Sequence, residues 1–405
     1  MCSTPAHGSR SRRIRLNRAE GFDTLPAVKH AILLISLVLS LGAVSCRDLA
    51  LEYYNQGIDA MEKNDPTAAA ESFEKSLSYR RDDPDVHVNL GAAYHALGDY
   101  DAALEHFKTA LDASPSDPLI HYNMAETYAA MGSQQAATRE YQTAIRFKED
   151  FHEALTGYGK LLMEMGNYET AEENLVRAIT VKPTYEKAYV YLGWVYAKTG
   201  KVNQATFYLY RGLKTDPNSI EGRMGLGMAF YEKGLYDEAL AEFEKAVLLD
   251  DTNPEAHLGI GRCRTALGSA APAEKALRRA IELKPDYPEA NLALGDLYFK
   301  QGEYAGAAAA YRLAAQQRND YVSAHMGLGR VFTATGDFAD AEESYQKALH
   351  IAPDDPWVLY QMGQLYRIMG DMARARVHFE KSLANAGTDE KLRALLSGAF
   401  ESLDK

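Results

Sequence analysis

The chain has 405 residues, of which 46% are hydrophobic, and its formal net charge is −12. This apolar fraction is sufficient for a packed core and excludes a wholly disordered chain. Residues 1–46 carry six basic and two acidic side chains, so residues 47–405 carry a net charge of −16, which disfavours nucleic-acid binding because phosphates repel so acidic a body.

The first segment in chain order is apolar. Residues 31–44 read AILLISLVLSLGAV and contain no charge. They are too few for a membrane-spanning helix, which needs about 20 residues, and they are typical of the apolar part of an export signal. The small residues Gly42, Ala43 and Ser45 then lead to Cys46.

This segment resembles a bacterial lipoprotein signal, in which small residues admit the peptidase and the cysteine becomes the lipidated first residue. One departure is Ala43, which stands where that family usually has Leu. We predict an export or lipoprotein signal over residues 1–46 with Cys46 as the lipidated residue. The alternatives are an uncleaved or ordinarily cleaved export signal and a chance apolar segment.

The three cysteines do not form a recognisable site. Cys2, Cys46 and Cys263 lie far apart, and no CxxC sequence occurs. They therefore predict neither a disulfide framework nor a cysteine zinc site, and Cys263 is expected to be a small packing residue within a helix.

A 34-residue period governs everything that follows the signal. The first series consists of glycines with one alanine at the missing place: Gly57, Gly91, Ala125, Gly159, Gly193, Gly227, Gly261, Gly295, Gly329 and Gly363. The second is all alanine: Ala69, Ala103, Ala137, Ala171, Ala205, Ala239, Ala273, Ala307, Ala341 and Ala375. The third marks a turn: Asn64, Gly98, Gly132, Gly166, Gly200, Gly234, Gly268, Gly302, Gly336 and Gly370.

Each period predicts one helical hairpin. In residues 288–321 we expect a first helix to about Lys300, a left-handed cap at Gly302, and a second helix from about Tyr304 to Gln317. Gly295 and Ala307 are expected to be small because the two helices touch there. Helix starts are marked by an acceptor followed by proline, as in Asp83-Pro84, Asp117-Pro118, Asn253-Pro254 and Asp355-Pro356.

This unit, with Leu-Gly-x-x-Tyr, then Ala-x-x-x-Phe/Tyr, then Ala and Pro, resembles the tetratricopeptide repeat. The resemblance covers residues 50–389 and implies an all-α fold, a right-handed superhelical solenoid of ten helical hairpins. Residues 390–405 are expected to form a C-terminal capping helix that shields the last repeat. The ten predicted repeats are 50–83, 84–117, 118–151, 152–185, 186–219, 220–253, 254–287, 288–321, 322–355 and 356–389.

Two features of the repeats bear on catalysis and packing. Gly225-Leu226-Gly227 lies within a predicted helix, so it cannot form a phosphate-binding loop. The histidines are expected to fall at unrelated phases and to be surface or groove residues. We predict no enzyme, cofactor, metal or small-molecule substrate.

Arg264 replaces a first-helix aromatic residue and predicts a locally looser core.

The resemblance implies that the first helices line a concave surface for partner peptides. Asn55, Asn89 and Asn123 share one position in three successive repeats, and such a row of amides can bond a peptide backbone. The alternative is that these amides bond their own neighbours.

An apolar series runs parallel to these asparagines and includes Tyr122 and Met224. Trp194, Met228 and Tyr231 thicken it in the fifth and sixth repeats. The alternative for the series is packing between adjacent first helices. The basic residues Arg262 and Arg330 are expected to select acidic peptide groups.

Together these patterns predict a non-enzymatic protein-interaction scaffold, anchored as a lipoprotein in the cell envelope facing the periplasm. By analogy with other repeat lipoproteins it would assist a pilus, secretion or wall-synthesis complex. Two alternatives are a cytoplasmic regulatory adaptor and an accessory subunit that delivers substrates to a separate enzyme.

Overall fold

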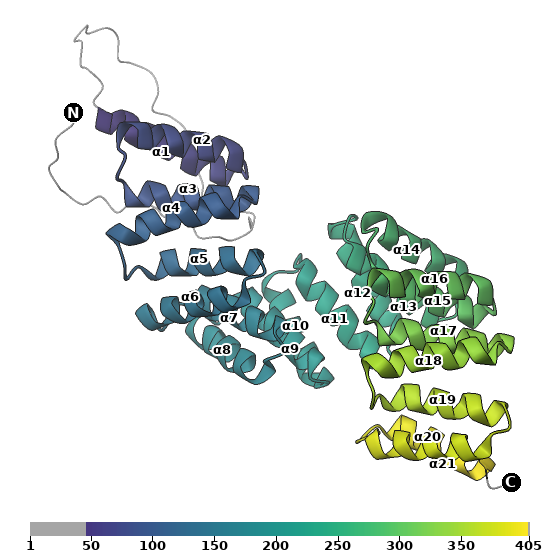
Figure 1. Ribbon diagram of the computed structural model, residues 1–405. Coiled ribbons are helices and arrows are strands. Elements are labelled where there is room, and N and C mark those ends of the chain that lie inside the picture. The colour runs from purple at the N-terminus through teal and green to yellow at the C-terminus, as the bar shows by residue number, and fades with distance from the viewer. Residues whose placement is uncertain (1–45, 404–405) are drawn as a thin grey trace, which may run out of the picture. The chain divides into compact units, whose positions relative to one another are not determined.

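The computed structural model describes residues 46–403, and every regular element within them is an α-helix (Figure 1). The predicted signal over residues 1–46 therefore lies outside the described residues except for Cys46, as do the last two residues of the predicted cap. None of the described helices is long and apolar enough to cross a membrane.

Contacts divide the chain into an N-terminal body, residues 1–195, and a C-terminal body, residues 196–405. The N-terminal body contains α1 (Cys46–Glu62), α2 (Pro66–Tyr79), α3 (Pro84–Leu97), α4 (Tyr100–Ala113), α5 (Pro118–Ala130), α6 (Gln134–Phe147), α7 (His152–Glu164), α8 (Tyr168–Val181) and most of α9 (Glu186–Lys198).

The C-terminal body contains α10 (Val202–Thr215), α11 (Ile220–Glu232), α12 (Tyr236–Leu249), α13 (Pro254–Ala266), α14 (Ala270–Leu283), α15 (Pro288–Gln301), α16 (Tyr304–Gln317), α17 (Val322–Thr335), α18 (Phe338–Ile351), α19 (Pro356–Ile368), α20 (Met372–Asn385) and α21 (Glu390–Leu403).

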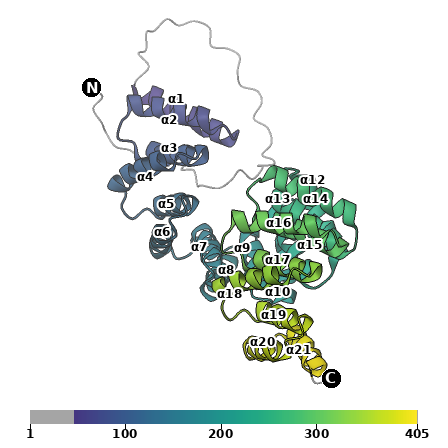
Figure 2. The ribbon, with the colours of Figure 1, turned by 45° about the vertical axis from the view of Figure 1, so that its right-hand side comes forward.

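Within each body the helices stack as successive hairpins (Figure 2). The two helices of a repeat pack together, as α15 does with α16, and a second helix also packs on the first helix of the next repeat, as α12 does on α13. First helices of neighbouring repeats contact one another directly, as α13, α15 and α17 do. The described residues thus form the predicted all-α solenoid.

The turns follow the predicted chemistry. Gly302 ends α15 with φ 78°, in the left-handed region, where a residue without Cβ avoids a steric penalty. Among the described non-glycine residues only Asn64 has a positive φ, at 58°, and it occupies the same place in the first repeat. Helix α1 begins at Cys46, four residues before the first predicted repeat boundary.

The small residues make room for rings. A Cβ added to Gly295 would lie 2.6 Å from the ring of Tyr311, and one added to Gly327 would lie 2.7 Å from it. The Tyr311 side chain, which is fully buried, therefore lies between two glycines of successive first helices. Gly295 is thus small because the second helix of its repeat touches it, as predicted, and the group that it accommodates is the ring of Tyr311.

Arg264 forms a hydrogen bond to a glutamate that a tyrosine forms at the equivalent position of another repeat. Its Nη2 lies 2.9 Å from Oε1 of Glu244. Five repeats earlier, the hydroxyl of Tyr94 donates to Glu74 at the equivalent positions. The position therefore keeps its acidic partner, although the ring is lost.

Candidate partner-binding surfaces

The predicted asparagine row in the N-terminal body is largely buried. Asn55 is exposed, whereas Asn89 and Asn123 are fully buried. The amide of Asn89 donates to the hydroxyl of Tyr54 at 2.8 Å, so it bonds the first helix of the preceding repeat. Only Asn55 is open to a partner in this structure, and binding through Asn89 and Asn123 stays a prediction.

The apolar residues at the neighbouring position are also packed. Tyr122 is 2% exposed and lies against the rings of Tyr141 and Phe151, with centroid distances of 6.3 and 5.3 Å. Met224 in the C-terminal body is 8% exposed. Tyr122 thus packs against the start of the next first helix, as the alternative interpretation expected.

Trp194, Met228 and Tyr231 are partly buried and retain accessible surface. Trp194 lies in the N-terminal body, whereas Met228 and Tyr231 lie on α11 in the C-terminal body. The Tyr231 ring packs on Tyr236 at 5.2 Å. Burial raises the pKa of Tyr231, and the nearby charge of Arg262 opposes that rise.

A second set of side chains lies on α13, α15 and α17 of the C-terminal body. Arg262, Asp296 and Arg330 occupy the same repeat position at intervals of 34 residues. Nη1 of Arg330 lies 3.9 Å from Oδ1 of Asp296, and its guanidinium lies 4.3 Å from the centroid of the Phe299 ring. We call Arg262, Asp296, Phe299 and Arg330 the arginine face.

Asp296 connects this face to the core. Its Oδ1 accepts a hydrogen bond from the Tyr311 hydroxyl at 2.7 Å. Surrounding protein raises the pKa of Asp296, and the Tyr311 bond and the charges of Arg330 and Arg262 oppose this effect. The sequence prediction named the two arginines but missed Asp296 and Phe299. The 34-residue spacing from Arg262 and Arg330 was the available signal for Asp296.

The histidines are not at unrelated phases, and that prediction was wrong. Four of them share the fourth position of their repeats, and a ring nitrogen of each lies 3.0–3.4 Å from the backbone carbonyl oxygen six residues earlier. These four are His87, His121, His257 and His325. The bond joins the start of each first helix to the preceding turn, so the role of the shared position is structural.

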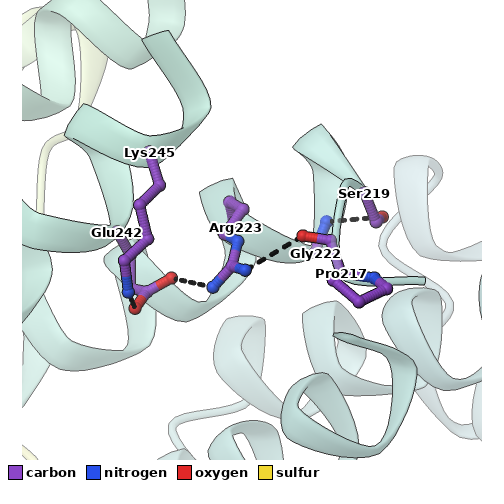
Figure 3. Close-up of polar contacts among 6 residues, drawn as sticks. All are labelled: Pro217, Ser219, Gly222, Arg223, Glu242 and Lys245. Atoms are coloured by element: carbon purple, nitrogen blue, oxygen red, sulfur yellow. Dashed lines mark hydrogen bonds and ion pairs between the residues drawn. The ribbon is translucent and has the colours of Figure 1, made fainter. Parts of the chain in front are cut away.

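In the sixth repeat an arginine performs the same task (Figure 3). Nη2 of Arg223 donates to the carbonyl of Pro217 at 2.9 Å, and Nη1 lies 2.7 Å from Oε2 of Glu242. Lys245 pairs with the other oxygen of Glu242 at 2.6 Å. Glu242 is buried but has two cationic partners, which offset the cost of removing its charge from water.

Two open cavities lie beside fourth-position histidines of the C-terminal body. One, of about 350 Å³, lies beside His257, and the other, of about 450 Å³, lies beside His325. The residue 19 positions after the histidine is Ala276 or Ser344, whereas Glu242 fills the equivalent place after Arg223. In residues 46–403 no group of three or more His, Cys, Asp or Glu side chains could hold a metal ion.

Comparison with known families identifies the repeat. One tetratricopeptide-repeat profile matches residues 94–161, 162–228, 230–297 and 332–398, and a second matches residues 54–118 and 292–356. The chain belongs to the tetratricopeptide-repeat family. This fold is typically a non-enzymatic scaffold, so membership supports a role in protein interaction.

Solved structures agree with this fold. A tetratricopeptide repeat protein from Parabacteroides merdae ATCC 43184 is 19% identical, with a TM-score of 0.50, and the match covers 61% of this chain and 98% of that one. The human IFIT1 dimer with m7Gppp-AAAA is 16% identical, with a TM-score of 0.55, covering 86% and 96%. At these identities the likeness establishes the fold alone. A search of curated protein sequences finds no significant match.

Proposed function

We propose that this tetratricopeptide-repeat protein is a lipid-anchored scaffold of the cell envelope that binds peptide segments of other proteins along its first helices. The observation that carries the binding part is the arginine face together with Tyr231. It joins the exposed Asp296 with partly buried arginine and aromatic side chains on contacting helices, an arrangement suited to a peptide.

The anchoring part rests on the sequence before α1 and on Cys46, which is exposed where the described residues begin. Two or more acyl chains on this cysteine would hold the protein on a membrane, whereas a single chain is marginal. The envelope machine that it would assist is a pilus, secretion or wall-synthesis complex facing the periplasm.

Incorporation of radiolabelled palmitate tests the anchor. We expect label in the wild-type protein and none in Cys46→Ala. Label that persists in the variant would contradict lipidation at Cys46. A wild-type protein without label would contradict the anchor altogether and favour a cytoplasmic adaptor.

Affinity capture tests the binding surface. We expect Tyr231→Ala/Phe299→Ala, which removes two aromatic rings of this surface, to lose partners that the wild-type protein recovers. A matched control is Phe207→Ala/Tyr210→Ala, which removes two aromatic rings that are each 54% exposed on α10. If both double variants recover the same partners as the wild type, the assignment of the surface is wrong.

A further inference from the structure

Arg262 differs from the other arginines around it. It is partly buried on α13, and it forms no hydrogen bond or ion pair with any described residue. Arg264, two residues later, bonds Glu244, and Arg330 lies against Asp296 and Phe299. Arg262 is thus a cation whose hydrogen-bond donors are left available by residues 46–403.

Three tyrosines and one aspartate lie close enough to Arg262 for its charge to lower their pKa values. Its guanidinium lowers the pKa values of Tyr231, Tyr287, Tyr321 and Asp296 against the raising effect of burial. These groups come from α11 and from the start of α15 and α17, as well as from α15 itself. A bound group at Arg262 would therefore have aromatic side chains near it.

The local charge indicates the sign of that group. Arg262 and Arg330 are two cations, and Asp296 is the carboxylate that both of them stabilise. Glu255 and Glu289, which also act on Tyr287, are paired with Lys284 and Arg318, so one further carboxylate would balance the set. A second acid beside Asp296 would be repelled by it, since like charges at short range are unfavourable.

We propose that Arg262 binds the carboxylate of a single Asp or Glu side chain in a partner peptide lying across α11, α13 and α15. The planar guanidinium can donate two parallel hydrogen bonds to one carboxylate. Tyr231 on α11 supplies apolar surface for a residue that flanks the acid. This inference rests on the proposed function, because it specifies the peptide chemistry that the same surface selects.

Selection from a displayed library of random 12-residue peptides on the full chain tests the proposal. We expect the selected peptides to be enriched in one acidic residue. Their affinity should fall about 10- to 100-fold for Arg262→Gln, the range that loss of a charge-assisted bond implies. Arg312→Gln, which makes the same change on the exposed face of α16, should leave affinity unchanged.

The peptide itself provides a second measurement in case Arg262→Gln does not fold. Replacing the acid of a selected peptide by Gln or Asn should weaken its binding to the wild-type chain by the same factor. Selected peptides without an acidic residue, or peptides that bind Arg262→Gln and the wild type equally, overturn this inference and leave the proposed function standing. If no peptide is selected, both are overturned.

Discussion

At the scale of single residues, the stack depends on how closely rings and backbones approach. Tyr311 is held between Gly295 and Gly327, and its hydroxyl is tied to Asp296. Because the ring is fully buried and bonded at its tip, it cannot move aside cheaply. The glycine positions are therefore determined by packing, although both lie in helices, where glycine is otherwise unfavourable.

Gly327→Ala should accordingly destabilise the protein. The new Cβ would meet the Tyr311 ring at 2.7 Å, and overpacking of this kind costs about 1–3 kcal/mol. Denaturant unfolding measures the change. Gly398→Ala on α21 is the matched control, since no atom lies within 4 Å of its added Cβ, and it should stabilise by up to about 1 kcal/mol. Equal effects of the two substitutions would refute the packing account.

A partly buried histidine, His95, makes stability depend on pH. Nδ1 of His95 lies 3.0 Å from Oγ1 of Thr127, whose hydroxyl donates to the carbonyl of Asn123. The Thr127 oxygen is thus the acceptor and His95 Nδ1 the donor. Burial lowers the pKa of His95 to about 4, because a charged ring would lose its hydration.

His95 therefore binds a proton more readily in the unfolded chain. Its contribution to stability is present above the unfolded pKa of about 6.5 and is lost as the pH falls towards 4. We expect His95→Gln to lose less stability than the wild type between pH 7 and pH 4, by about 1–3 kcal/mol. Urea unfolding at a series of pH values measures this, and identical pH profiles would exclude the contribution.

At the scale of helices, local chemistry decided what could be predicted. An acceptor before proline and a glycine after the last turn determine where a helix begins and ends, and α15 and α16 end within a residue of their predicted limits. The burial of Asn89 could not be predicted in this way. Asn89 is buried because its amide lies within hydrogen-bond distance of the Tyr54 hydroxyl on the preceding repeat. The period of the sequence contains no information on that distance.

The same reason explains the error on the histidines and the incomplete site. The shared fourth position was visible as a spacing, but its meaning depends on a carbonyl six residues earlier that only the folded turn brings into reach. Likewise, Arg262 and Arg330 were predicted from residue type, whereas the pairing of Arg330 with Asp296 follows from the contact between α15 and α17. Intervals along the sequence predict which residues share a face of the helices. The contacts between helices decide which of these residues form ion pairs with one another.

Helix caps provide a test at this scale. Asp355 precedes α19, and its carboxylate accepts hydrogen bonds from the backbone N–H groups of Trp357 and Val358, both at 2.9 Å. Asp355→Ala should cost about 1 kcal/mol, because two amides of the first turn lose their partner. Glu303→Ala is the control, since Glu303 precedes α16 without a side-chain cap bond. Thermal unfolding compares the two, and an equal loss would show that the cap contributes nothing.

At the scale of the whole molecule, charge bears on how the protein could meet a membrane. Residues 47–405 carry a net charge of −16, so their long-range field repels anionic lipid head groups. The described helices offer no membrane-spanning segment. If the protein is attached as proposed, acyl chains on Cys46 supply the attachment, and the net negative charge of the solenoid is not expected to add attraction to anionic lipid.

The unlipidated chain beginning at Cys46 should therefore not sediment with phosphatidylglycerol vesicles at low ionic strength, where any electrostatic attraction would be strongest. A chain acylated at Cys46 should sediment with both phosphatidylglycerol and phosphatidylcholine vesicles, since insertion of acyl chains does not require a charged surface. Vesicle co-sedimentation at two salt concentrations distinguishes the mechanisms. Net charge does not show how Lys and Arg are distributed over the individual faces of the protein. Salt-sensitive binding of the unlipidated chain to the anionic vesicles would therefore mean that a basic patch, and not the acyl chains on Cys46, recruits the protein.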